Sequence, residues 1–341
     1  MKITSTKIDD LNQVLTLEVA AEDYAQARKK KLAELQKNAN LPGFRKGHVP
    51  ASMIEKFYGE SVLGDTINNV VAKALQDYVQ ENKLNIIGEP LPSEEKIEQE
   101  WKNGNDFTFK FDIALSPEIA LELTSKDTIP YYNITVSDED KTKLIEGYKK
   151  QQELSAKAAE EAGNEPQPAM ADEELEKLVN EQLENDYKNA AQFRFEKELK
   201  DYCVAKSGIQ VPEAFLRRWL IAVNEGKFTA EQIDKDFAGF IEDYKWQLVM
   251  AELIKKFEIK LDEADIKEEA KAFARYQYSM YGIMNAPEDM LESMAQNIMQ
   301  DQNTFQRLVE NAQTKKVIAA AKELITVKNE KISSEKFREL K

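Results

Sequence analysis

Residues 42–50 read PGFRKGHVP and stand between two segments with helical character. A glycine on each side of the aromatic residue and its two cations allows the tight turn that a short loop between helices needs. The loop is therefore predicted to display Phe44 with an arginine and a lysine at its tip, as a docking surface would, because a ring anchors and cations steer. The alternative is an ordinary solvated loop with Phe44 tucked into the core. The candidate docking residues are Gly43, Phe44, Arg45, Lys46, Gly47 and Pro50.

The segments around this loop predict a small α+β domain over residues 1–115. Apolar and polar residues alternate on both sides of Asp9-Asp10, which predicts a β-hairpin. One helix is expected from about Glu22 to Asn38, and a second is expected to begin at Pro50, where apolar spacings of three and four follow. Strand-like alternation at 85–87 and 107–113 would complete a sheet packed on these helices.

The rest of the chain is predicted to be helical after an extended start. Residues 116–154 are expected to form an extended linker and a first long helix, which Ser137 and the carboxylates after it would begin. Residues 155–171 are acidic, contain Gly163 and two prolines, and read as a linker between helices. Helical spacing then dominates 172–341, which predicts an all-α C-terminal domain of long helices.

Charge and composition exclude several classes of protein. The chain has 341 residues, with 47 Lys and Arg against 62 Asp and Glu, for a net charge of −15. Such a balance argues against a general nucleic-acid binder, because phosphate neutralisation supplies most of that affinity. Eight basic and two acidic residues nevertheless stand between Arg28 and Lys56, a local charge of +6 around the loop.

Few residues are available for catalysis or metal binding. One cysteine, Cys203, and one histidine, His48, leave almost nothing for a zinc site or a Ser-His-Asp triad, so no catalytic site, metal or cofactor is expected. No apolar run reaches the length of a membrane span, and the N-terminus alternates instead of forming a signal peptide. We therefore expect a soluble, cytoplasmic protein that contacts no membrane and is not an enzyme.

The loop also resembles the signature Gly-Phe-Arg-x-Gly-x-x-Pro of the bacterial trigger factors, which are ribosome-associated chaperones. Gly43, Phe44, Arg45, Gly47 and Pro50 match it. The resemblance covers most of residues 1–150 and about 172–341. It implies a ribosome-docking N-terminal domain and an elongated all-α chaperone domain with helical arms. The implied partners are the ribosomal large subunit at the exit tunnel, unfolded or nascent polypeptides, and a second copy when the protein is free. The resemblance also associates the chain with protein export and cell division.

The chain departs from the family at one position. Trigger factors usually carry an FKBP-type prolyl isomerase domain, whose insertion point would fall near Lys150–Asp172. Seventeen residues of linker composition, 155–171, cannot build a sheet with an aromatic proline pocket. The isomerase activity of the family is therefore not expected here, and residues 155–171 are predicted to connect two helices only.

A methionine-rich stretch in the helical part is the predicted client-binding surface. Flexible thioethers and aromatic rings adapt to many apolar sequences. A helical core rich in methionine is the alternative for any single residue, and Phe215, Trp219, Phe240 and Trp246 are predicted to be core. The client-binding candidates are Phe273, Tyr276, Met280, Met284, Met290 and Met294.

These observations favour an ATP-independent chaperone that docks at the ribosomal exit and shields apolar nascent segments. A prolyl isomerase is one alternative, and a missing domain counts against it. A periplasmic chaperone with a related helical core is another, and the loop at 42–50 together with the missing export signal counts against that one.

Overall fold

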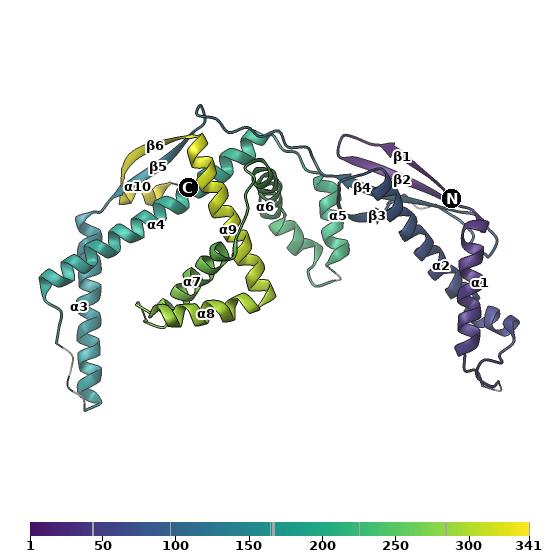
Figure 1. Cartoon of the computed structure of the whole chain (residues 1–341), viewed down its shortest axis with the longest axis horizontal. Coiled ribbons are helices and arrows are strands. Elements are labelled where there is room, and N and C mark those ends of the chain that lie inside the picture. The colour runs from purple at the N-terminus through teal and green to yellow at the C-terminus, as the bar shows by residue number, and fades with distance from the viewer. Residues whose placement is uncertain are drawn as a thin grey trace. The chain divides into compact units, whose positions relative to one another are not determined.

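The computed structural model describes residues 1–42, 44–95, 97–163, 165, 168–224, 226–283 and 285–340. The chain divides into two compact units, Met1–Glu118 with Ile209–Lys245, and Ile119–Gly208 with Trp246–Lys341 (Figure 1). This division differs from the predicted one, in which a single helical domain spans 172–341. Residues 209–245 belong with the first unit because helix α5 packs on its sheet.

The first unit is built on a four-stranded antiparallel sheet in the order β1-β2-β4-β3. The strands are β1 (Lys2–Lys7), β2 (Asn12–Val19), β3 (Ile86–Pro92) and β4 (Phe107–Leu115). The predicted hairpin is present, since β1 and β2 pair from Lys2↔Glu18 to Lys7↔Gln13. Leu15, Leu17 and Val19 are buried on the face that packs against the helices.

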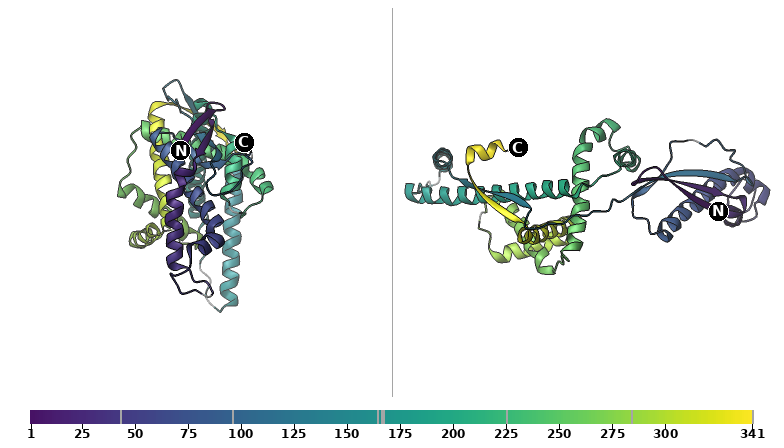
Figure 2. Two further views of the ribbon diagram at one scale, coloured as in Figure 1. Left: turned by 90° about the vertical axis from the view of Figure 1, so that its right-hand side faces the viewer. Right: turned by 90° about the horizontal axis from the view of Figure 1, so that it is seen from above.

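Helix α2 (Ala51–Glu81) covers that face of the sheet, and α1 (Ala21–Asn38) packs along α2 and adds Tyr24 to the same core (Figure 2). Pro50 precedes the first residue of α2, as predicted, because proline at a helix start sacrifices no internal hydrogen bond. Leu63, Ile67 and Val71 of α2 lie one turn apart and are buried against the sheet. The amphipathic spacing thus fixes which face of α2 meets the strands.

Helix α5 (Glu213–Val223) adds to this unit from far along the chain. Arg218 donates to the Asp112 carboxylate at 2.5 Å and to the Pro92 carbonyl oxygen at 2.9 Å. The helix after it, α6 (Ala230–Lys256), begins after Thr229, whose hydroxyl accepts from the Gln232 amide while the Gln232 side chain accepts from the Thr229 amide, as in a capping box. Phe215 is buried as predicted, whereas Trp219, Phe240 and Trp246 are half-buried.

Long helices dominate the second unit. They are α3 (Asp138–Glu161), α4 (Asp172–Ser207), α7 (Glu263–Met280), α8 (Glu288–Gln300), α9 (Gln302–Leu324) and the short α10 (Ser334–Glu339). Ser137 caps α3, since its hydroxyl accepts from the Asp140 amide at 3.1 Å. The core forms where α4, α6 and α9 meet, around Phe195, Val249 and Val317.

The prediction of an all-α C-terminal domain is wrong in one respect. Strands β5 (Thr128–Thr135) and β6 (Thr326–Ser333) form a parallel pair in the second unit (Figure 1). The extended start of 116–154 is predicted to be a linker, yet β5 lies within it, packs on α4 and buries Ile129. Parallel strands need a long connection, and here the 190 residues 136–325 separate the two strands, so no local pattern could show the pairing.

The predicted linker 155–171 is also partly helical. Helix α3 continues to Glu161, because alanine, glutamate and lysine are strong helix formers even without apolar contacts. Gly163 follows with a positive φ of 75°. Asn164, Pro166 and Gln167 lie outside the described residues.

Candidate functional site

The predicted docking loop is held by the antiparallel pair α1–α2. Arg28 of α1 is buried, where it forms an ion pair with Glu55 and donates to the Gly59 carbonyl oxygen at 3.2 Å. An added Cβ at Gly59 would lie 3.2 Å from the Arg28 guanidinium, so the glycine allows this close approach. Lys31 and Asp65 form a second bridge at 3.0 Å. These pairs fix the spacing of the two helices that present the loop.

The base of the loop is ordered by hydrogen bonds and one buried side chain. Val49 is almost fully buried, and its carbonyl oxygen accepts from the Gln36 side chain at 2.8 Å. The His48 amide donates to the Arg45 carbonyl at 2.9 Å, closing a turn in which Gly47 has a φ of 79°. Such a φ favours glycine strongly over other residues. The tip therefore stands on a defined turn.

The tip itself faces solvent. Phe44 is 37% exposed and so does not lie in the core, and Arg45, Lys46, His48 and Pro50 are exposed as well. Gly43, the first residue of the predicted docking set, lies outside the described residues. A partly exposed ring between a turn and two cations can supply both apolar contact and charge to a partner.

The local charge of +6 counted from the sequence overstates what the surface presents. The buried pair of Arg28 and Glu55 leaves the count unchanged, because the count includes both charges, whereas Lys31 pairs with Asp65 beyond the counted segment and so lowers the charge by one. The remaining basic side chains are exposed, namely Lys29, Lys30, Lys37, Arg45, Lys46 and Lys56. The loop and the outer face of α1 therefore still carry the positive charge that a docking role needs.

The predicted client-binding residues are mostly at the surface rather than in the core. The exposed fractions are 38% for Phe273, 61% for Tyr276, 71% for Met280 and 39% for Met290. Met294 is half-buried, and Met284 lies outside the described residues. The nearby core consists instead of small or aliphatic residues around Ala270, Ala295 and Leu308.

Two further apolar residues join this surface, although the sequence did not single them out as binding residues. Tyr281 is 84% exposed and Ile283 is 41% exposed, on either side of Gly282. The signal that could have found them is Gly282 itself, since a glycine at φ 81° ends α7 and turns its neighbours outward. We call the exposed apolar side chains of this region the α7–α8 surface, comprising Phe273, Tyr276, Met280, Tyr281, Ile283 and Met290.

Ion pairs fix α7 against α8 beneath that surface. The ammonium group of Lys271, which is buried, lies 3.3 Å from Glu292 and bonds Glu288 more closely. The hydrogen bond to Glu288 raises the pKa of Lys271, and the hydrogen bond from Lys267 lowers the pKa of Glu292. The apolar side chains are thus exposed on a braced pair of helices.

The described residues hold no arrangement that suggests metal binding. None of their His, Cys, Asp and Glu side chains form a group of three that could hold a metal ion. Cys203 is buried, and burial raises the pKa of its thiol to about 12, which keeps it protonated and unreactive. Over the same described ranges, no helix is both long and apolar enough to cross a bilayer.

Models of known protein families match most of the chain. The family model of the bacterial trigger factor protein matches residues 1–148, and that of the probable trigger factor C-terminal domain matches residues 191–341. Trigger factors of three Coxiella burnetii strains, CbuK_Q154, CbuG_Q212 and RSA 493, are each 30% identical over 145 residues. That match covers 42% of this chain and only 32% of each relative.

The fold agrees with a solved structure as well. A trigger factor chaperone, described for its promiscuous substrate recognition in folding and assembly activities, has a TM-score of 0.52 at 15% identity. The match covers 94% of this chain and 99% of that one. An α+β N-terminal part followed by a mainly helical part is thus the fold of a known chaperone class. The chain belongs to the trigger factor family.

Proposed function

We propose that this protein is an ATP-independent chaperone that docks at the ribosomal exit tunnel and shields apolar segments of nascent polypeptides. The observation that carries the shielding role is the α7–α8 surface, where six apolar side chains face solvent on two helices braced by ion pairs and on the turn that follows α7. Exposed apolar patches on soluble domains mark interaction sites, because leaving them uncovered is unfavourable.

The docking role is supported by the loop. Phe44, Arg45 and Lys46 are exposed on a turn that Gln36 and Val49 anchor, and the loop matches the family signature in sequence. Its partner would be the large ribosomal subunit in the cytoplasm. A homodimer of the free protein, which the family resemblance suggests, would be a second partner.

We infer further that this activity requires no prolyl isomerase module. Residues 149–190 separate the two family matches, and they consist of the end of α3, a connection and the start of α4. A folded domain needs about 50 residues or more, and the connection at 162–171 is far shorter.

The test of the shielding role is a triple variant, Tyr276→Ser with Met280→Ser and Met290→Ser. Because these side chains are 61%, 71% and 39% exposed, their loss should change the free energy of unfolding by less than about 1 kcal/mol. Suppression of the aggregation of a denatured model protein should weaken several-fold. Met170→Ser, at an exposed methionine of the α3–α4 connection, is the matched control and should leave suppression unchanged. Full suppression by the triple variant would refute the role assigned to this surface.

A further inference from the structure

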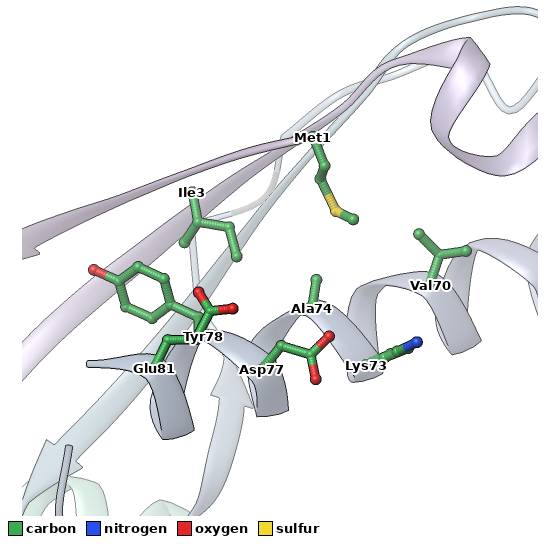
Figure 3. Close-up of a pocket in the computed structure, with 8 residues that line it drawn as sticks. All are labelled: Met1, Ile3, Val70, Lys73, Ala74, Asp77, Tyr78 and Glu81. Carbon is green, nitrogen blue, oxygen red and sulfur yellow. The ribbon is translucent and has the colours of Figure 1, made fainter. Parts of the chain in front are cut away.

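Helix α2 leaves part of the N-terminal sheet uncovered. A helix is about 10 Å across, whereas four strands about 4.8 Å apart span roughly 14 Å between the outer strand axes alone. On the β1 side of α2 this leaves a cavity of about 520 Å³ (Figure 3). Its apolar lining comes from Met1 and Ile3 at the start of the chain and from Val70, Ala74 and Tyr78 of α2. The cavity is therefore a groove between a helix and an edge strand.

The α2 side of this groove carries an excess of negative charge. Asp77 and Glu81 lie one helical turn apart and are exposed, and both line the groove together with Lys73 (Figure 3). Two carboxylates against one ammonium leave the α2 side with a net charge of about −1, and the N-terminal ammonium of Met1, which also lines the groove, is paired with Asp23 at 2.8 Å. An occupant with an apolar side chain and a neighbouring basic side chain would complement it.

Strand β1 beside the groove is an open edge. Among the described residues its one partner strand is β2, in a regular register without a bulge or a proline. Its two lysines are engaged within the chain, Lys2 with Glu18 at 3.7 Å and Lys7 with Asp10 at 2.7 Å. Between them stand the uncharged residues Ile3 to Thr6. Edge strands that lack a central charge, proline or bulge offer their outward N–H and C=O groups to another strand.

We propose that the β1 edge and the groove together bind an extended, basic polypeptide segment as a fifth strand of the sheet. Main-chain hydrogen bonds to β1 hold the segment, and alternate side chains point to the α2 side, as in other cases of strand addition. One apolar side chain enters the cavity over Ile3 and Ala74, and a lysine or arginine reaches Asp77 and Glu81. This site is separate from the docking loop and from the α7–α8 surface.

The test uses a fluorescein-labelled peptide of eight residues that alternates valine and lysine, titrated with the full chain while anisotropy is measured. Two matched peptides accompany it, one N-methylated at alternate backbone nitrogens and one with glutamate in place of lysine. We expect the parent peptide to bind and each matched peptide to bind at least tenfold more weakly. Failure of the parent peptide to bind, or equal binding of the N-methylated peptide, would overturn the proposal.

Variants of the chain test whether the peptide binds at the groove beside β1. Asp77→Asn with Glu81→Gln should weaken binding of the parent peptide by about fivefold, the combined effect of two exposed ion pairs. Glu22→Gln with Glu60→Gln, at exposed carboxylates outside the groove, should have no effect. The triple serine variant of the α7–α8 surface should bind the peptide as the unchanged protein does. If that triple variant loses the peptide while the groove variant keeps it, the client surface is the binding site and the proposal is wrong.

Discussion

Gly88 illustrates how one residue sets the packing of a distant helix. It has a φ of 65°, and an added Cβ would lie 2.5 Å from the indole nitrogen of Trp219. Trp219 belongs to α5, and its neighbour Arg218 bonds Asp112 and the Pro92 carbonyl of the same sheet. The indole N–H is buried and has no hydrogen-bond partner among the described residues. The ring therefore rests on the bare glycine backbone.

Gly88→Ala should destabilise the first unit by about 2 kcal/mol or more, because the substitution adds both a strained φ and an overlap with the ring. Gly64→Ala is the matched control, since Gly64 lies in α2 with nothing within 4 Å of an added Cβ. It should stabilise the helix by up to about 1 kcal/mol. Urea unfolding followed by tryptophan fluorescence measures the free energy of unfolding of both variants. Equal free energies of unfolding for the two variants would contradict both the strain at Gly88 and the overlap with the Trp219 ring.

Elements that depend on local pattern were predicted well, and those that depend on distant pairing were not. The helices flanking the loop and the hairpin of β1 and β2 follow from spacing, and the start of α3 follows from the cap at Ser137. The pairing of β5 with β6 was missed, because the charged residues of 326–333 read as further helix and their partner strand is about 200 residues away. The docking of α5 on the N-terminal sheet was missed for the same reason.

Asp140 joins three elements of the second unit through one carboxylate. Ser137, Ser334 and Arg338 each donate to it at 2.6 Å, and Tyr187 of α4 donates as well. The hydrogen bond from Arg338 is the largest cause that holds the pKa of Asp140 well below its ordinary value, and the hydroxyl groups add to it. The short α10 is thus attached to the start of α3 and to α4.

Asp140→Asn should lower the free energy of unfolding by about 2 kcal/mol at pH 7, where the carboxylate is charged in both folded and unfolded chains. A depressed native pKa gives stability that is complete above the unfolded pKa of about 4 and is lost as the pH falls below it. The difference in free energy of unfolding between the Asp140→Asn variant and the unchanged protein should therefore be smaller at pH 3 than at pH 7. Denaturant unfolding at both pH values measures it, with the exposed Asp186→Asn as control. A difference in free energy of unfolding that is the same at both pH values would contradict a stabilising role for the charged Asp140 carboxylate.

At the scale of the whole molecule, the sequence predicted where the two candidate surfaces lie, but it did not predict which of their side chains are paired or exposed. The loop at 42–50 and the methionine-rich stretch at 273–294 were found from composition and spacing, and both lie largely at the surface. The pairing of Arg28 and Lys31 with α2 could not be predicted, because it depends on how two helices pack. The exposure of Tyr281 and Ile283 likewise depends on where α7 ends.

The full chain should not accelerate proline isomerisation in a short peptide above the rate in buffer. The physical reason is that residues 162–171, between α3 and α4, are too few to enclose a proline ring in an aromatic pocket. A protease-coupled assay over a range of chain concentrations measures the rate, with an FKBP-type isomerase as the positive control. A rate that rises in proportion to the concentration of the chain would contradict the prediction.

Docking on the ribosome is the central claim, and co-sedimentation with purified ribosomes tests it most directly. The triple variant Phe44→Ala, Arg45→Ala and Lys46→Ala should lose binding while its melting temperature stays nearly unchanged, because all three side chains are exposed. Lys102→Ala with Lys235→Ala, at exposed lysines outside the loop and α1, is the matched charge control and should retain most of the binding. Binding by the unchanged protein should weaken with added salt, since charge attraction is screened. Undiminished sedimentation of the triple variant with ribosomes would contradict the account.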